Sequence, residues 1–228
     1  LMAADYSQIE LRIIASLSNE ENMMNAFKNK EDIHASTASA VFNVPINQVT
    51  KEQRSNAKVV NFGIIYGVSA FGLSNQTSLN RKESKELIEK YYEKYPKLKQ
   101  YINNQISFAR ENGYVETLLG RRRYLRDINS RNSFVRSAAE RNAINAPVQG
   151  SAADIIKIAM INIEKKLRND GYNSKMLLQV HDELVFDVFK PELNDIINLV
   201  KNQMEKAYEI KVPLTVDVNY GSNWLEAH

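Results

Sequence analysis

Apolar residues follow two spacings along the chain, one typical of helices and one typical of short strands. Over most of the length they recur every three or four residues, which predicts amphipathic helices. Short apolar runs bounded by polar or turn residues predict strands, and one run after Tyr114 leads into a basic turn at Gly120. The predicted strands are Leu1–Ala4, two arms of a hairpin within 114–124, Met176–Val180, Leu184–Val188 and Leu214–Tyr220.

Capping residues mark where several helices begin. Asp32 is placed to cap a helix that runs to Val41, and the sequence Thr50-Lys-Glu-Gln53 has the pattern of a capping box. The helix after Thr50 extends to about Tyr66, where Gly67 can end it. The other predicted helices cover residues 8–17, 81–94, 97–111, 131–145, a segment around 152–163 and 191–208.

The segment around Pro147 divides two of these helices. Because proline has no backbone N–H, we expect the helix from Arg131 to end near Asn145 and the chain to restart at Pro147. Beyond it, an apolar stripe at helical spacing predicts buried positions at Ala152, Ile155, Ile156, Ala159 and Ile163. Together the elements predict an α+β protein in which helices cover a small, mostly antiparallel sheet.

Composition narrows the class of protein. Hydrophobic residues make up 43% and charged residues 25% of the 228 positions, a balance typical of a globular domain rather than a disordered chain or a coiled coil. Cysteine is absent, which excludes disulfides, thiolate metal sites and cysteine nucleophiles. The formal net charge of +3 is too small to indicate nucleic acid by itself.

The ends and the apolar runs of the sequence bear on location. No run reaches the roughly 18 apolar residues of a membrane span, and the start lacks the pattern of a signal peptide, so we expect a soluble protein with no membrane partner. The chain opens at Leu1 inside an apolar run that leads to Asp5. We therefore expect a fragment that begins in the middle of a secondary-structure element.

Two acids at the ends of predicted strands are candidates for chemistry. Asp5 follows the first strand, and Asp182 lies with Glu183 at the tip of the predicted hairpin within 176–188. Taken singly, a turn aspartate usually caps its own backbone. If the two strands are neighbours in one sheet, however, both carboxylates meet at one edge. Such a pair suits two Mg²⁺ ions, as in phosphoryl transfer.

The helix after Thr50 carries a second candidate set. Arg54, Lys58, Phe62 and Tyr66 recur every four residues and occupy one gently spiralling face. Two cations followed by two aromatics suit a nucleoside triphosphate, whose phosphates attract cations and whose sugar and base need flat apolar surfaces. A solvated cationic edge beside two core aromatics explains the spacing equally well. The Gly-rich pattern of a Walker-type phosphate loop is absent, which disfavours that class of nucleotidase.

Three segments together resemble the conserved motifs of family A DNA polymerases. They are Asp5-Tyr-Ser-Gln-Ile-Glu-Leu-Arg12, Arg54-x-x-x-Lys58-x-x-x-Phe62-Gly-x-x-Tyr66-Gly67 and Val180-His-Asp-Glu183, which resemble motifs A, B and C in the family's order. Asn145-Ala-Pro-Val-Gln-Gly-Ser-Ala-Ala-Asp154 and the closing segment 216–224 extend the resemblance over nearly the whole chain.

The resemblance implies a metal site and catalytic roles. Asp5 and Asp182 would hold two Mg²⁺ ions, for which Mn²⁺ can substitute, with the backbone carbonyl of Tyr6 as an added ligand. Glu183 resembles the family's auxiliary acid. Lys58 would donate a proton to the leaving pyrophosphate after the primer 3′ hydroxyl attacks the α-phosphate.

The resemblance also implies a nucleotide site and a DNA surface. Glu10 would be the steric gate that selects deoxyribose, Phe62 in place of Tyr predicts discrimination against dideoxynucleotides, and Tyr66 would stack near the templating position and yield it as the helix closes. The implied nucleotide-binding residues are Gln8, Glu10, His34, Arg54, Lys58, Phe62 and Tyr66. The implied contacts to primer-template DNA, largely along the minor groove, are Arg141, Asn145, Gln149 and His181.

By the same resemblance, residues 1–18 and 129–228 form a palm and residues 19–128 form a large helical fingers insertion. The family's thumb, upstream palm and exonuclease regions have no counterpart in these residues, so we expect reduced or no activity from the chain alone. The expected setting is the bacterial cytoplasm, at the nucleoid. Two alternatives stay open: a non-catalytic module that binds primer-template or nucleotide, and a relative of the single-subunit RNA polymerases, against which Glu10 and the sequence His181-Asp182-Glu183 argue.

Overall fold

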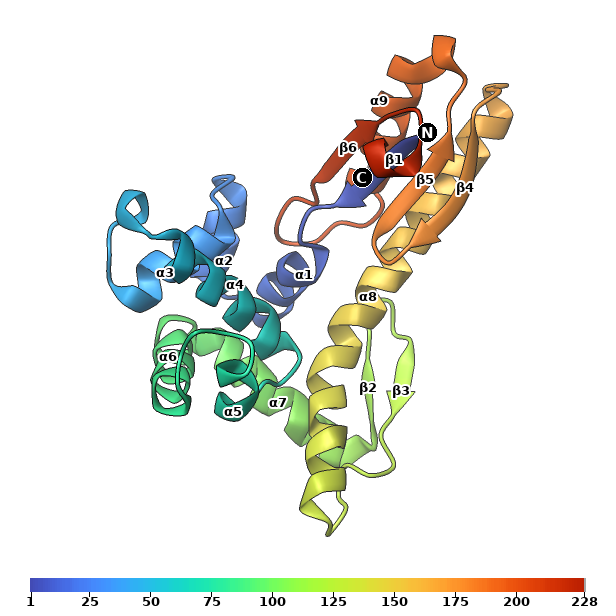
Figure 1. Cartoon of the computed structure of the whole chain (residues 1–228). Coiled ribbons are helices and arrows are strands. Elements are labelled where there is room, and N and C mark those ends of the chain that lie inside the picture. Colours follow the sequence, from blue (N-terminus) through green and yellow to red (C-terminus); the bar gives the residue numbers. More distant parts are fainter. Residues whose placement is uncertain (228) are drawn as a thin grey trace. The chain divides into compact units, whose positions relative to one another are not determined.

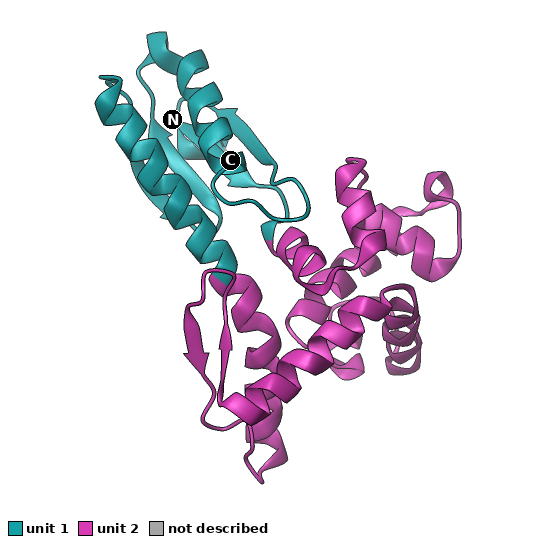
Figure 2. Ribbon diagram, turned by 180° about the vertical axis from the view of Figure 1, so that it is seen from behind, with its two compact units in different colours: residues 1–9, 151–228 teal, residues 10–150 magenta. Residues whose placement is uncertain are grey.

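The computed structural model describes residues 1–227, which fall into two compact units. Unit 1 comprises residues 1–9 together with the segment from Ser151 onward, and unit 2 comprises residues 10–150 (Figure 2). The chain passes between the units within two helices, α1 (Ile9–Ser18) and α8 (Ser133–Asn169). The compact units divide near residues 9 and 150, and the palm and fingers limits at residues 18 and 128 stay predictions.

Unit 1 is built on a four-stranded sheet with the order β4-β5-β1-β6. The strands are β1 (Met2–Tyr6), β4 (Lys175–Val180), β5 (Glu183–Asp187) and β6 (Val216–Tyr220), and each neighbouring pair is antiparallel (Figure 1). The central strands are almost wholly buried, whereas the edge strand β4 exposes Leu177 and Leu178. The expected small antiparallel sheet is confirmed, and the first and last strands of the chain lie side by side in it.

The first strand extends further than the sequence indicated. The apolar pattern predicts an end at Ala4, but β1 includes Asp5 and Tyr6 because both edges of the strand are paired there. Asp5 lies opposite Glu183 on one side and Asp217 on the other, and Tyr6 lies opposite Val216. Cross-strand pairing therefore overrides the weak strand preference of an aspartate.

The hairpin between β4 and β5 is also tighter than expected. Val180 pairs with Glu183, so the turn consists only of His181 and Asp182, and Glu183 belongs to the strand rather than to the tip. His181 has a φ of 53°, the left-handed conformation that two-residue hairpin turns require. The turn thus places Asp182 directly before a buried strand.

Helices cover the sheet of unit 1. α9 (Leu193–Glu205), preceded by the 3₁₀ turn Lys190–Glu192, packs on β1 and β6, and the second half of α8 runs alongside β4 and β5 (Figure 1). The apolar stripe of α8 is buried as expected, except that Ala152 is only half-buried. Tyr6 is locked into this core, since its hydroxyl donates to the Met204 carbonyl oxygen at 2.7 Å. A short C-terminal helix, α10 (Trp224–Ala227), follows β6.

Helix α8 corrects the expectation of a break at Pro147. The helix is continuous from Ser133 to Asn169 and contains Pro147 in its interior. A proline there loses one helical hydrogen bond and crowds the preceding turn. The surrounding turn is nonetheless held by burial, since Ala143, Ile144 and Val148 are all at most 6% exposed. Tertiary packing therefore keeps a helix that local sequence preference would interrupt.

Unit 2 is mainly helical. Its cores include a cluster under the small hairpin, formed by Ala109, Val115, Leu125, Ile128, Ala139 and Ala143. The elements of unit 2 are most of α1, α2 (Glu21–Lys28), α3 (Ile33–Phe42), the 3₁₀ turn Ile46–Gln48, α4 (Lys51–Ile65), α5 (Ala70–Ser74), α6 (Arg81–Lys94), α7 (Pro96–Asn112), β2 (Tyr114–Glu116), β3 (Arg122–Tyr124) and the first half of α8.

Two predicted helix starts are confirmed in atomic detail. The Asp32 carboxylate accepts from the backbone N–H groups of His34 and Ala35 at the start of α3. Thr50 and Gln53 form the expected capping box at the start of α4, with both reciprocal hydrogen bonds present. These caps fix the starting points of the two helices that carry His34, Arg54 and Lys58.

Candidate functional site

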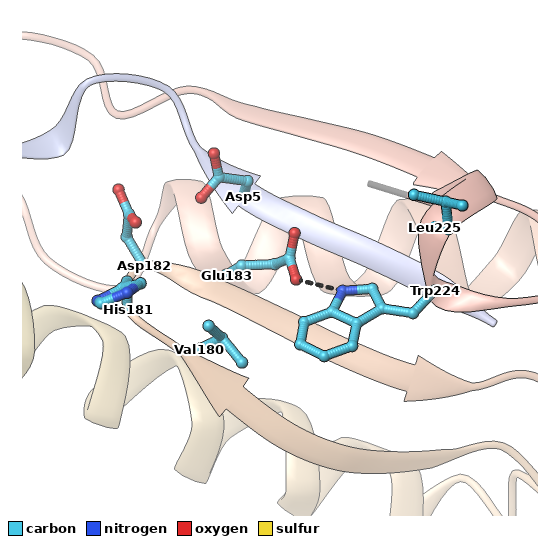
Figure 3. Close-up of a pocket in the computed structure, with 7 residues that line it drawn as sticks. All are labelled: Asp5, Val180, His181, Asp182, Glu183, Trp224 and Leu225. Atoms are coloured by element: carbon cyan, nitrogen blue, oxygen red, sulfur yellow. Dashed lines mark hydrogen bonds between the residues drawn. The ribbon is translucent and has the colours of Figure 1, made fainter.

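The two candidate acids of unit 1 lie close together: Asp5 is on β1, and Asp182 is in the turn directly before the neighbouring strand β5. Pairing of β1 with β5 places Asp5 opposite Glu183, and the backbone N–H of Tyr6 donates to the Asp182 carbonyl oxygen at 3.3 Å. Figure 3 shows the carboxylates of Asp5 and Asp182 at the same end of this strand pair. The sequence-based condition for a shared carboxylate site, two adjacent strands in one sheet, is therefore met.

A cavity of about 490 Å³ lies beside these acids. Its lining consists of Asp5, Val180, His181, Asp182, Glu183, Trp224 and Leu225 (Figure 3). Asp5 and Asp182 are half-buried, so their carboxylates can be reached from the cavity while the strands hold their backbones. The cavity unites four predicted site residues, since His181 and Glu183 also line it.

Trp224 is a site residue that sequence reasoning missed. Its indole N–H donates to the Glu183 carboxylate at 2.9 Å, and the same ring lines the cavity (Figure 3). Helix α10 is tied back at its start, because the Glu226 carboxylate accepts from the backbone N–H and the hydroxyl of Ser222. A lone tryptophan 41 positions from Glu183 gives no sequence signal of this contact.

The donor set suits a hard divalent cation. Carboxylate oxygens are ligands that Mg²⁺ prefers, and Asp5 and Asp182 present two carboxylates that line the same cavity. Within residues 1–227, no group of three or more His, Cys, Asp or Glu side chains is arranged to hold a metal by itself. Mg²⁺ sites in proteins commonly keep several coordination positions for water or substrate oxygens.

In unit 2, the predicted face of α4 lines a second cavity. Lys58, Phe62 and Tyr66 border a space of about 620 Å³, which Arg141 of α8 also lines. Gly67 has a φ of +66° after the last turn of α4, and a Cβ there would lie 2.7 Å from Cγ of Arg141. A glycine is thus required where the chain leaves α4 and passes this arginine.

Glu10 and Tyr66 are joined directly. The Tyr66 hydroxyl donates to the Glu10 carboxylate at 2.7 Å, although the two residues are 56 positions apart. Two residues that the sequence assigned to the sugar and to the templating position are therefore mutually positioned by one hydrogen bond. Charge-assisted bonds of this kind are the stronger ones.

Asp32 is a second residue whose role sequence reasoning understated. Besides capping α3, its carboxylate accepts from Nε of Arg54 at 2.7 Å. Partial burial would raise the pKa of Asp32, but the hydrogen bonds from Arg54 and from two backbone N–H groups hold that pKa below its ordinary value. Asp32 thereby orients one of the two predicted phosphate-binding cations.

His34 is buried in unit 2. Its side chain packs against Phe62, with ring centroids 5.7 Å apart, and the residue is only 2% exposed. Burial is the main cause that lowers the pKa of His34 to about 4, opposed by Asp32 and assisted by the charges of Arg54 and Lys58. The imidazole is therefore neutral near pH 7.

The buried histidine predicts acid destabilisation. Because the folded-state pKa of about 4 lies below the unfolded value of ~6.5, the unfolded chain binds more protons between these pH values. Stability is complete above pH ~6.5 and falls as the pH decreases, by about 2 kcal/mol between pH 7 and pH 5. Urea unfolding of wild type and His34→Gln at the two pH values measures this loss.

The matched control for that measurement is His181→Gln, since His181 is exposed. The control should keep the pH dependence of the wild type, and His34→Gln should lose most of it. Equal slopes for all three proteins would show that His34 does not carry the effect.

The remaining predicted DNA contacts lie on α8 or at the hairpin turn. Arg141 lines the second cavity, and Gln149 lines a small groove of about 90 Å³ beside the basic segment Arg121–Arg123. Asn145 has a buried side-chain oxygen without a hydrogen-bond partner in the described part of the chain. Such an atom is costly unless a ligand or water satisfies it.

The predicted nucleotide-binding residue Gln8 lies in unit 1, just after β1, with a φ of 52°.

Unit 1 thus presents acids on and beside neighbouring strands of one sheet, and unit 2 presents a helix whose cations and aromatics line a cavity. The sequence matches the family described as DNA polymerase family A over residues 1–226. The chain therefore belongs to this family, and the resemblance identified in the three motifs is confirmed.

Curated relatives agree with this assignment. DNA polymerase I of Caldicellulosiruptor bescii is 52% identical over 226 residues, which cover 99% of this chain and 27% of that protein. DNA polymerase I of Streptococcus pneumoniae serotype 4 is 53% identical over 228 residues, which cover 100% of this chain and 26% of that protein. The chain thus spans about a quarter of the length of these relatives.

A solved structure supports the fold. The POL domain of Pol1 from M. smegmatis, in complex with DNA primer-template and dNTP, matches with a TM-score of 0.94 at 47% identity. The match covers 99% of this chain and 40% of that one. The α+β fold is therefore confirmed as that of part of a polymerase domain. Among residues 1–227, none of the helices is both long and apolar enough to cross a membrane.

Proposed function

We propose that the chain is the palm and fingers core of a DNA-templated DNA polymerase, which adds deoxynucleotides to a primer 3′ hydroxyl and releases pyrophosphate. The observation that carries the proposal is that Asp5, on β1, and Asp182, in the turn before the adjacent strand β5, line one cavity. Family membership and the primer-template and dNTP bound to the M. smegmatis relative support the choice of partners.

In this proposal the carboxylates of unit 1 bind the metal ions at which the reaction takes place. Asp5, Asp182 and the Tyr6 carbonyl would hold two divalent cations, Mg²⁺ or Mn²⁺, which supply charge neutralisation and favour the attacking oxygen in its deprotonated form. The primer 3′ oxygen forms a bond to the α-phosphorus, and the bond from that phosphorus to pyrophosphate breaks. Glu183, held by Trp224, supports the geometry of Asp5 across the strand pair.

The helical unit would hold the nucleotide. Arg54, oriented by Asp32, and Lys58 would bind the triphosphate, and Lys58 would donate a proton to the departing pyrophosphate. His34 would contribute a further hydrogen bond to the phosphates. Gln8 would take part in nucleotide binding from the end of β1.

Sugar and base would be read by Glu10, Phe62 and Tyr66. The Tyr66–Glu10 hydrogen bond holds the gate in place against the sugar, and its release would accompany movement of α4 over a correct pair. Arg141, Asn145, Gln149 and His181 would contact primer-template DNA, which would satisfy the unpaired Asn145 oxygen.

Single-nucleotide primer extension with Mg²⁺ tests the proposal. The expected result is extension with dNTP and much weaker extension with rNTP. Since the chain spans about a quarter of its relatives, a second arm places these 228 residues in the matching segment of the Streptococcus pneumoniae polymerase. No extension by the chimera, while that parent polymerase extends, would contradict the proposal.

The small share of the relatives' length that this chain matches favours one other candidate function, a non-catalytic binding module. A chain that matches only 26% of a polymerase can bind primer-template or nucleotide without turnover. This candidate predicts three results. The chimera extends the primer, the isolated chain does not extend it, and the isolated chain still binds primer-template. Equal use of rNTP and dNTP would instead favour a relative of the RNA polymerases.

A further inference from the structure

A buried chain of hydrogen bonds ends at His34. The Tyr95 hydroxyl lies 3.0 Å from the Thr37 hydroxyl, Thr37 donates to the Asn61 side-chain oxygen at 3.1 Å, and the Asn61 amide nitrogen lies 3.1 Å from Nδ1 of His34. All four residues are at most 2% exposed. They come from α3, α4 and the junction of α6 with α7, and α3 packs directly on α4 (Figure 1).

The donor and acceptor of each of these hydrogen bonds follow from counting the available protons. Thr37 has one hydroxyl proton, which it gives to Asn61, so the Tyr95 hydroxyl must donate to Thr37. The opposite orientation of the Asn61 amide would make Thr37 donate to Tyr95. The Tyr95 proton would then have no acceptor, because Thr37 is its only hydrogen-bond partner among residues 1–227. A buried donor without an acceptor is energetically costly, which favours donation from Tyr95 to Thr37 and from Thr37 to Asn61.

This direction determines where the imidazole proton lies. Asn61 presents an N–H to Nδ1 of His34, so Nδ1 accepts and a neutral ring must carry its proton on Nε2. The groups that face His34 agree with a neutral ring. Asp32 favours the charged form, but burial and the charges of Arg54 and Lys58 on α4 oppose it and lower the pKa. The side chains of Asn61 and Phe62, which contact the ring, carry no charge.

We propose that Asn61, oriented by Thr37 and Tyr95, is a positioning residue that fixes His34 as the neutral Nε2–H tautomer, so that His34 donates an uncharged hydrogen bond to a phosphate oxygen of the incoming nucleotide. This inference rests on the proposed nucleotide site and deepens it. Arg54 and Lys58 supply the positive charge of that site. A neutral donor adds direction without repelling these two cations, as an imidazolium would.

The tautomer is measured directly, without any nucleotide. Long-range ¹H–¹⁵N NMR of the imidazole nitrogens distinguishes a proton on Nε2 from one on Nδ1. The wild type should show the Nε2–H form at pH 7. Asn61→Asp has the same size but offers only acceptors, so its His34 should carry a proton on Nδ1. Asn56→Asp is the matched control, a buried asparagine of α4 about 140° away around the helix.

Kinetics then connect the tautomer to the nucleotide. Asn61→Asp should raise the dNTP KM roughly tenfold at pH 8, where a neutral ring presents Nε2 without its proton. The ratio of mutant to wild-type KM should fall toward one at pH 6, where the variant's imidazolium again offers an Nε2–H. Taking the ratio cancels the ionisation of the triphosphate itself, and kcat should change little.

Thr37→Val provides a second variant, which alters the same series of hydrogen bonds. It removes the donor that orients Asn61, so NMR should show mixed tautomers of His34 and the dNTP KM should rise by a smaller factor. A proton on Nδ1 in the wild type would overturn the proposal. A KM ratio of one for Asn61→Asp at both pH values would overturn it as well. Failure of the proposed function shows separately, as absent extension by the wild-type chimera.

Discussion

Asp182→Asn is expected to lower single-nucleotide primer extension by at least about a thousandfold, or ~4 kcal/mol of transition-state stabilisation. The substitution keeps the size of the side chain and the two-residue turn, but it removes one negative charge from the carboxylates beside the cavity. Because Asp182 lies in the turn and is only half-buried, the isosteric change to Asn should leave folding unaffected.

The sole tryptophan gives a readout of this change that does not depend on activity. Trp224 lines the same cavity as Asp5 and Asp182, so a paramagnetic ion bound there should quench its fluorescence. Mn²⁺ should quench the wild type saturably, and Asp182→Asn should raise the half-quenching concentration at least tenfold, which corresponds to about 1.4 kcal/mol.

Asp187→Asn is the matched control, because Asp187 is an exposed acid at the far end of the same strand. It should retain both extension and quenching. Extension is compared in the isolated chain and in the chimera with the Streptococcus pneumoniae polymerase. If Asp182→Asn and Asp187→Asn both behave like the wild type, the assignment of the metal site to Asp5 and Asp182 is wrong.

Glu10→Ala is expected to increase the use of rNTP relative to dNTP by about tenfold to a hundredfold. The carboxylate occupies the position that the family motif assigns to the sugar gate, and truncation to alanine opens space for a 2′ hydroxyl. The measured quantity is the ratio of kcat/KM for dGTP and rGTP in primer extension on one template.

Two further variants separate bulk from hydrogen bonding at this gate. Glu10→Gln keeps the volume and can still accept from Tyr66, so the sugar selectivity should stay close to the wild type. Tyr66→Phe removes the bond that holds Glu10 and should give an intermediate loss of selectivity. Unchanged selectivity in Glu10→Ala would show that another residue excludes ribose.

Several features of the fold could be predicted because their signals are local. The capping boundaries at Asp32 and Thr50 follow from side chains that satisfy nearby backbone N–H groups. The hairpin and the stripe in α8 follow from the period of apolar residues. The four-residue spacing from Lys58 to Tyr66 places these residues on one cavity by helix geometry alone.

Other features could not be predicted because they depend on distant partners. Continuity of α8 through Pro147 comes from burial on both sides of the proline. The extension of β1 through Tyr6 comes from strands that arrive from the C-terminal third of the chain.

The sequence by itself determined the family, the sheet with its helices, and the acids, cations and aromatics that could do the chemistry, because these depend on residue type and short-range spacing. Only the tertiary structure decided that Asp32 orients Arg54, that Trp224 holds Glu183, that Tyr66 is bonded to Glu10 and that Asn61 meets a buried His34. Hydrogen bonds act over about 3 Å in space, whereas these pairs lie 22 to 56 positions apart along the chain.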